Sequence, residues 1–257
     1  MPIKTAILGY GYGRSGSTLH ADPIEKRPEF ELTAVCDIDP AAREKAAKRF
    51  GCRLYADYHD MLAREDLDLV VIVTRSSQHS PMACDCLEAG KNVLVTKPWA
   101  LDLAGADAMI AAAERSGKLL MPWLPARWGS DLIRIKELVA SGVIGKVFQV
   151  RRSEFTFGVR FDWQTEKKYG GGYLLNWGPH LVDQPMQLIG QPVTSVYGEL
   201  KQIINPGDVE DVFFAVMKTA NDVTLVSEFN IGAGLLPNWV VQGDKGNLDA
   251  LLRQARG

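Results

Sequence analysis

The amino-acid sequence predicts an α/β domain with a doubly wound parallel sheet, followed by an α+β domain with a mostly antiparallel sheet. Apolar runs and helix-like segments alternate over residues 1–122, the pattern of a parallel sheet with helical crossovers. Past Pro122 and Pro125, strand-like runs follow one another directly, which is typical of antiparallel pairing. A length of 257 residues accommodates two modest domains, and we expect them at 1–122 and 123–257.

Composition excludes several classes of protein. Hydrophobic residues make up 46% of the chain, enough for a sizeable core, and the formal charge of −2 predicts no nucleic-acid partner. The apolar runs at 69–73 and 119–124 are far shorter than the roughly 20 residues of a membrane-spanning helix, and the N-terminus lacks the long apolar region of a signal peptide. The four cysteines lack zinc-ligand spacing. We therefore expect a cytoplasmic protein with free thiols and no metal.

Each element of the first domain has its own signal. The five expected strands read as unbroken apolar runs, as expected where helices cover both sheet faces; they are Ile3–Tyr10, Leu32–Cys36, Leu67–Val73, Asn92–Val95 and Lys118–Met121. Helix-like stretches fill the intervals, with starts at Asp39-Pro40, Ser80-Pro81 and Asp102, and stops at Gly51, Gly90 and Gly117. A further stretch after the first strand runs to about Arg27.

The second domain has fewer helical signals. One helix is expected around Ser130–Ala140. Strand-like runs, bounded by Gly, Pro, Asn and Asp, lie at Lys146–Glu154, Ser195–Ile203, Val209–Lys218, Thr224–Ile231 and Trp239–Gln242. The last residues, Leu248–Gly257, are expected to form a short helix or loose tail.

A glycine cluster follows the first strand. Gly11, Gly13 and Gly16 satisfy the G-x-G-x-x-G pattern between a strand and a helix, the context that favours binding of a dinucleotide pyrophosphate at the helix N-terminus. Asp37 lies 21 residues after Gly16, at the end of the second strand, where a carboxylate accepts hydrogen bonds from ribose hydroxyls. This pattern predicts a Rossmann fold that binds NAD. Arg14 or Arg43 can reduce the preference for NAD over NADP, so NADP is the alternative cofactor. The alternative is that these glycines only form a tight turn.

Four ordered segments resemble the Gfo/Idh/MocA family of sugar and polyol oxidoreductases. GYGRSGSTLHA at 11–21 is similar to the family's fingerprint, and 35–51 resembles its second strand and helix. Residues 71–98 end in Thr-Lys-Pro where the family usually has Glu-Lys-Pro, and GGGYLLNWGPHLVDQ at 170–184 resembles the family's Gly-Gly…Asp-x-Gly-x-His-x-x-Asp segment.

The resemblance implies hydride transfer between a nicotinamide cofactor and a secondary alcohol of a sugar, polyol or similar substrate. Such a reaction needs a proton acceptor for the hydroxyl and a cation beside the developing oxyanion. Lys97 and His180 are the predicted catalytic residues. The predicted cofactor contacts are Gly11, Gly13, Arg14, Ser15, Gly16, Asp37, Thr74, His79 and Lys97. The predicted substrate contacts are Asn176, Trp128, Trp163 and Asp183.

Each assignment has a structural alternative. Lys97 can be a solvated surface lysine, His180 a structural histidine, and the tryptophans fillers of the domain junction. On a continuous helix, Asn176, His180 and Asp183 share one face, but Pro179 also allows a helix that starts near Gly178 and leaves Asn176 in a loop. Asn176 stands where the family usually has aspartate, which shifts proton transfer toward His180 and Lys97.

The sequence is also compatible with two other functions. The replacements at Thr96 and Asn176 also fit a non-catalytic regulator that senses NAD(P) and a sugar, and some relatives are glycosidases that use bound NAD. The resemblance further implies a homo-oligomer, a dimer or tetramer, built on the open face of the second sheet. Relatives tend to have a larger second domain, so we expect this chain to be a shortened member with an incomplete second sheet.

Overall fold

The computed structural model describes residues 1–11, 15–234 and 236–251, and the chain divides into two units at 1–123 and 124–257. The elements of the first unit, in chain order, are β1 (Ile3–Leu8), the π-helix η1 (Ser15–Ala21), α1 (Asp22–Glu25), β2 (Phe30–Cys36), α2 (Pro40–Phe50), β3 (Arg53–Tyr55), α3 (Tyr58–Arg64), β4 (Leu69–Ile72), the 3₁₀ turn η2 (Ser76–Gln78), α4 (His79–Glu88), β5 (Asn92–Thr96), α5 (Leu103–Ser116) and β6 (Leu120–Trp123).

The first sheet is parallel throughout, in the order β3-β2-β1-β4-β5-β6. This is the doubly wound order of a Rossmann fold, whose ligand crevice lies beyond the carboxyl ends of the strands, where the strand order reverses between β1 and β4. The predicted fold class is therefore confirmed. The sheet has six strands rather than the five expected, because β3 contains only three residues and is too short to produce an apolar run. The helix α3 was missed for the same reason of length.

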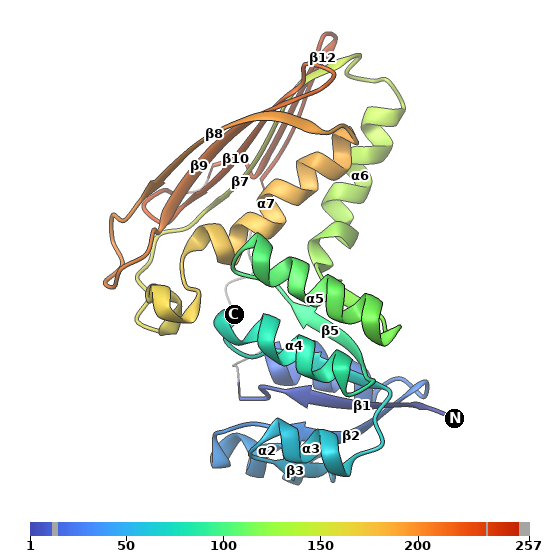
Figure 1. The fold of residues 1–257 in the computed structure, drawn as a ribbon. Coiled ribbons are helices and arrows are strands. Elements are labelled where there is room, and N and C mark those ends of the chain that lie inside the picture. Colours follow the sequence, from blue (N-terminus) through green and yellow to red (C-terminus); the bar gives the residue numbers. More distant parts are fainter. Residues whose placement is uncertain (12–14, 235, 252–257) are drawn as a thin grey trace. The chain divides into compact units, whose positions relative to one another are not determined.

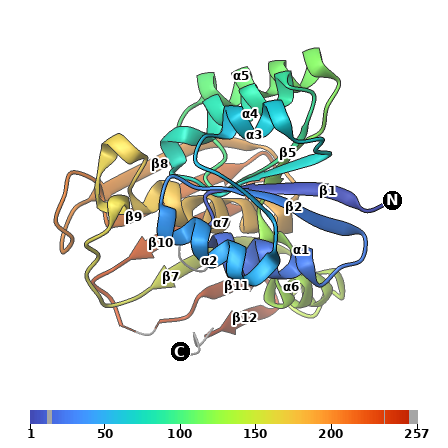
Figure 2. The same cartoon turned by 90° about the horizontal axis from the view of Figure 1, so that it is seen from below.

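Alternating side chains explain why helices cover both faces of this sheet. On β1, Ala6 and Leu8 pack into one core with residues of α3, α4 and α5, whereas Ile7 packs into a second core with residues of η1, α1 and α2. Figure 2 shows α4 and α5 on one side of the strands and α1 and α2 on the other. The apolar runs thus bury both alternate sets of side chains.

The second unit combines two long helices with a second sheet. Its elements are η3 (Pro125–Trp128), α6 (Ser130–Ala140), β7 (Val147–Phe155), η4 (Trp163–Thr165), η5 (Lys167–Tyr169), α7 (Tyr173–Ile189), β8 (Val193–Lys201), β9 (Val212–Thr219), β10 (Thr224–Asn230), β11 (Trp239–Gly243) and β12 (Gly246–Ala250). The strand order is β12-β11-β7-β10-β9-β8, and among the described residues of this second sheet only β7 and β10 pair in parallel. The mostly antiparallel sheet is as predicted.

The helices α6 and α7 lie along one face of this sheet (Figure 1). Leu132 and Ile135 of α6 and Val182 of α7 pack with apolar residues of β7, β9, β10 and β11 to form the core. The edge strand β8 is exposed over nearly its whole length.

The prediction of a helix or tail from Leu248 was wrong for the described residues. Gly246–Ala250 forms β12, which pairs with β11 so that Leu248 lies opposite Val241. A turn at Asp244 and Lys245 joins the two strands. Residues 252–257 lie outside the described part of the chain.

Candidate active site

The glycine turn after β1 places the first predicted cofactor residues. Gly9 has a φ of +90°, which favours glycine, and a Cβ on Gly16 would lie 2.4 Å from the carbonyl oxygen of Tyr10. Gly16 therefore permits η1 to pack closely on the backbone just after β1, in keeping with the close helix–strand packing that the third glycine of the fingerprint allows. Gly13 and Arg14 lie outside the described residues, and Ser15 opens η1.

Asp37 reaches the same turn from the end of β2. Its Oδ2 accepts a hydrogen bond of 2.7 Å from the backbone N–H of Gly11, and its Oδ1 accepts one of 2.8 Å from Asp39. A Cβ on Gly11 would lie 3.1 Å from this Oδ2, so glycine permits the close approach. Arg43 donates to the backbone carbonyl of Asp37 at 2.6 Å. Because each carboxylate oxygen has a further lone pair, Asp37 can still accept bonds from ribose hydroxyls. The turn and the carboxylate thus fit a dinucleotide.

Lys97 follows β5 directly and is half-buried. The residue before it, Thr96, donates its hydroxyl to the carbonyl of Ile72 on β4 at 3.1 Å. His79, at the start of α4, is 1% exposed, and its ring nitrogens lie 2.7 Å from the carbonyl oxygen of Pro98 and 3.1 Å from that of Thr74. Burial lowers the pKa of His79, and the positive charge of Lys97 acts in the same direction.

Helix α7 carries three of the residues predicted in the second domain. It runs unbroken from Tyr173, so the alternative of a helix that starts near Gly178 is wrong, and Asn176, His180 and Asp183 lie on one helical face. Its N-terminus is satisfied from outside, because Glu210 accepts bonds from the backbone N–H groups of Tyr173 at 3.2 Å and Leu174 at 2.9 Å.

The ring of His180 meets that of Trp177 edge-on at 6.0 Å. Asp183 is bound by Arg127 of η3, whose Nε and Nη2 donate to its two carboxylate oxygens at 2.9 and 2.7 Å. This pair joins α7 to η3, which also carries Trp128. Trp128 is 80% exposed, whereas Trp163 on η4 is half-buried.

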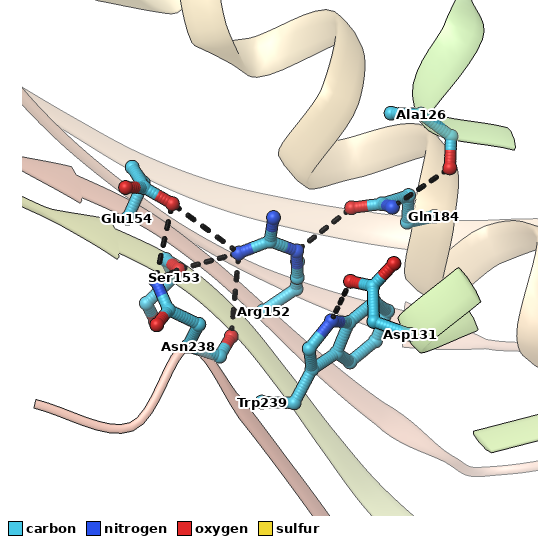
Figure 3. A network of polar contacts seen from close by, with 8 residues as sticks. All are labelled: Ala126, Asp131, Arg152, Ser153, Glu154, Gln184, Asn238 and Trp239. Carbon is cyan, nitrogen blue, oxygen red and sulfur yellow. Dashed lines mark hydrogen bonds and ion pairs between the residues drawn. The ribbon is translucent and has the colours of Figure 1, made fainter. Parts of the chain in front are cut away.

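A buried polar network was not anticipated from the sequence. Arg152 of β7 is 5% exposed and donates to the side-chain oxygen of Gln184 at 2.7 Å, while the Gln184 amide nitrogen donates to the carbonyl of Ala126 at 2.9 Å (Figure 3). Asn238 donates to Glu154 at 3.0 Å on the other side of the guanidinium. Each of the four side chains is buried and has a hydrogen-bond partner, as is usual for buried polar groups. The sequence signal for such a network is weak, because its members come from distant segments.

Further features of the described residues concern a cavity, metal-binding clusters and membrane-spanning helices. A cavity of about 600 Å³ between α6 and the hairpin of β11 and β12 is lined by Asp131, Arg134 and Trp239 among others, and none of the predicted site residues line it. Within residues 1–11, 15–234 and 236–251, no group of three or more His, Cys, Asp or Glu side chains is placed to hold a metal ion. Likewise, none of the described helices combines the length and apolarity needed to cross a membrane.

Comparison with known proteins agrees with this geometry. Residues 3–123 match the model of an oxidoreductase family with an NAD-binding Rossmann fold, and residues 132–249 match the GFO/IDH/MocA C-terminal domain. The oxidoreductase YdgJ of Escherichia coli is 30% identical over 247 residues, which cover 95% of this chain and 70% of that protein.

Two further relatives have more informative names. The D-apiose dehydrogenase of Paraburkholderia graminis is 30% identical over 251 residues, covering 94% of this chain and 65% of that protein. The crystal structure of GenD2 from gentamicin A biosynthesis, in complex with NAD, is 29% identical and superposes with a TM-score of 0.90, covering 100% of this chain and 74% of that chain.

The family model, the relatives and the glycine turn with Asp37 agree on the cofactor and the class of reaction. The resemblance seen in the sequence, the NAD cofactor and the enzyme class are confirmed. This chain is an NAD(P)-dependent oxidoreductase of the Gfo/Idh/MocA family.

Proposed function

We propose that this protein transfers a hydride reversibly between NAD and a secondary alcohol of a sugar or polyol, with Lys97 and His180 as its catalytic residues. One observation carries the proposal. The glycine turn, Asp37, Thr74 and Lys97 follow the carboxyl ends of β1, β2, β4 and β5 in one parallel sheet, the edge where ligands of doubly wound folds bind. In this proposal residues 1–122 bind the nucleotide and residues 123–257 supply the substrate contacts.

Asp37 supports a preference for NAD over NADP. Its carboxylate lies at the glycine turn, with Oδ2 2.7 Å from the nitrogen of Gly11, and a negative charge there repels a 2′-phosphate. The guanidinium of Arg43 donates to the backbone carbonyl of Asp37, and its positive charge at this residue can moderate the preference for NAD.

The chemical roles follow from charge and proton affinity. Bound NAD supplies the hydride acceptor. The Lys97 ammonium would hold the reacting oxygen and stabilise the negative charge that develops on it. His180 would remove the hydroxyl proton in oxidation and return it in reduction, because imidazole exchanges protons near neutral pH. Asn176, on the same face of α7, would hydrogen-bond a neighbouring substrate hydroxyl without taking its proton.

The substrate class rests on the relatives and on exposed aromatic surface. A relative named D-apiose dehydrogenase acts on a sugar, and the exposed ring of Trp128 offers an apolar face of the kind that packs on sugar C–H groups. Trp163 is the second proposed wall.

Assembly and compartment belong to the same proposal. The exposed strand β8 offers an unpaired edge that supports a homo-oligomer, a dimer or tetramer. The four cysteines are free, and burial raises the pKa of Cys36 and Cys86 to about 12, so both stay protonated thiols. Free thiols support a cytoplasmic location.

A turnover screen tests the proposal. Purified protein is incubated with NAD or NADP and a panel of polyols and aldoses, and the absorbance of reduced cofactor at 340 nm is followed. We expect turnover with NAD on at least one member of the panel. Nucleotide binding without any absorbance change would instead indicate a sensor, and release of aglycone from aryl glycosides without net NADH would indicate a glycosidase.

A further inference from the structure

We propose that His79 and Thr96 are positioning residues for Lys97, which they hold by fixing the backbone on both of its sides. The inference rests on the catalytic role proposed for Lys97. It assigns His79 a task other than the cofactor contact predicted from the sequence.

The first restraint lies directly before Lys97. Thr96 is the last residue of β5, is 7% exposed, and donates its hydroxyl to the carbonyl of Ile72, the last residue of β4, at 3.1 Å. Both residues lie where two neighbouring parallel strands end. The bond therefore joins the ends of β4 and β5 at the residue immediately before Lys97.

The second restraint lies directly after Lys97. The carbonyl oxygen of Pro98 is 2.7 Å from Nδ1 of His79, and the carbonyl oxygen of Thr74 is 3.1 Å from Nε2 of the same ring. A neutral imidazole has one N–H, and the shorter distance assigns it to Nδ1, which then donates to Pro98. Nε2 then carries a lone pair and does not donate to Thr74, so the restraint is the one bond from His79, at the start of α4, to the segment after β5.

Burial separates this role from ligand binding. His79 is 1% exposed and both its ring nitrogens face backbone carbonyls, so the ring has no nitrogen directed at a cofactor. The neighbouring Ser80 donates to the carbonyl of Gly105 at 2.9 Å, so the first two residues of α4 hold both ends of the segment from Pro98 into α5. The backbone that carries Lys97 is therefore fixed from β4 and α4.

Fixed placement matters for a catalytic ammonium. A displacement of about 1 Å at a reacting group can cost about a hundredfold in rate, even when the altered residue touches no ligand. Loss of either restraint is expected to lower kcat while NADH binding at the glycine turn persists. A residue that only supports the fold would lower thermal stability without this selective loss.

The experiment compares isosteric variants. Thr96→Val removes the hydroxyl and keeps the shape of the side chain. Thr5→Val is the matched control, because Thr5 is also fully buried in this sheet and donates to a local carbonyl, that of Ile3, at 3.0 Å. His79→Leu removes the ring N–H, whereas His79→Asn, of nearly the same shape as leucine, keeps an N–H group near the position of Nδ1.

Two readouts are measured on the full chain: kcat with the Kd of NADH, and the ¹³C NMR signal of Lys97 after reductive methylation with ¹³C-formaldehyde, assigned with Lys97→Arg. Thr96→Val and His79→Leu should lower kcat about tenfold or more, change the Kd of NADH less than about threefold, and shift the Lys97 signal. His79→Asn should recover part of the loss, and Thr5→Val should leave kcat and the signal unchanged.

Several outcomes would overturn the inference. One is a Thr96→Val variant whose Lys97 signal is unshifted and whose kcat is within about twofold of the parent. Another is a loss of kcat in Thr5→Val equal to that in Thr96→Val. Should His79→Leu fail to fold, Thr96→Val alone decides. Full turnover in Lys97→Ala would refute the catalytic role instead, and the NMR signal would still report whether the two residues position Lys97.

Discussion

Arg127 and Asp183 form a two-bond ion pair between η3 and helix α7, with nitrogen–oxygen distances of 2.9 and 2.7 Å. The Asp183 side chain is 16% exposed and that of Arg127 46% exposed. Asp183 was predicted to contact the substrate; each of its oxygens accepts one bond from the guanidinium and keeps a further lone pair that can accept from a hydroxyl. Bidentate geometry of this kind fixes the orientation of both partners, and so of the Trp128 segment against α7.

We expect this pair to stabilise the second unit. In a double-mutant cycle with Arg127→Gln and Asp183→Asn, unfolding in urea should give a coupling free energy of about 1 kcal/mol, within the range for partly exposed pairs of good geometry. Both single variants should change KM by similar small factors. Zero coupling, together with a large rise in KM for Asp183→Asn alone, would mean that Asp183 binds substrate directly.

Ser227 compensates for a proline inside α7. Pro185 has no N–H to donate to the carbonyl of Leu181, four residues earlier, and the buried Ser227 hydroxyl donates to that carbonyl at 2.8 Å. Ser227→Ala should cost about 1–3 kcal/mol in free energy of unfolding, because it leaves a buried carbonyl unsatisfied. In a Pro185→Ala background the cost should fall, since the new N–H can serve Leu181.

Ser153 provides the control for this prediction. It is equally buried on the neighbouring strand β7, and its hydroxyl has no hydrogen-bond partner among the described residues. Chemical denaturation of Ser153→Ala should show a much smaller loss than Ser227→Ala. Equal losses for the two serines, or no rescue by Pro185→Ala, would contradict this account of the helix.

Asp37 should set the preference between the two nicotinamide cofactors. Asp37→Asn keeps an oxygen that can accept from Gly11 but removes the charge that repels a 2′-phosphate. The ratio of NADPH to NADH affinity, measured by fluorescence titration, should rise about tenfold or more, equivalent to about 1.4 kcal/mol. Asp57→Asn is the control, because Asp57 caps the helix after the neighbouring strand β3. An unchanged ratio in Asp37→Asn would remove Asp37 from the cofactor site.

His20 should make stability depend on pH. It is 5% exposed, its ring packs against that of Trp123 at 4.6 Å, and burial lowers its pKa to about 4 from 6.5. Between these two pH values the unfolded chain binds a proton that the native chain excludes. The native state therefore has its full free energy of unfolding with respect to His20 above pH 6.5. This free energy falls as pH drops toward 4, by a total on the order of 3 kcal/mol.

The measurement is urea unfolding between pH 4 and 7.5. His20→Phe keeps an aromatic ring against Trp123 and should flatten the dependence on pH, whereas His59→Gln, at an exposed histidine, should not. His79 is retained in both variants, so their difference reports His20. An equally steep loss of stability in His20→Phe would contradict the prediction.

Much of the first unit could be predicted because its signals are local. Buried strands such as β4 are unbroken apolar runs, and Asp39 and Gly51 mark the ends of α2 as expected, with Asp39 accepting from Ala41 and Gly51 in the left-handed conformation. The strand β3 has no such signal, because it consists of one apolar residue between Arg53 and Tyr55.

The contacts within the site were much less predictable, because they join segments far apart in the sequence. Arg127 and Asp183 are separated by 56 positions, and Ser227 and Leu181 by 46. The residue types at these positions are common and carry no pattern of their own. The start of α7 at Tyr173 likewise involves a distant residue, since Glu210 accepts from the backbone N–H groups of the first two helix residues.

The catalytic roles of Lys97 and His180 are tested by the turnover of Lys97→Ala and His180→Ala on the best substrate found with NAD, at saturating cofactor, with the Kd of NADH measured in parallel. Lys91→Ala serves as control. We expect both variants to lose about 10²–10⁴-fold in kcat while the Kd of NADH stays within a few-fold of the parent and Lys91→Ala remains active. Undiminished turnover in either variant would contradict the catalytic role assigned to that residue.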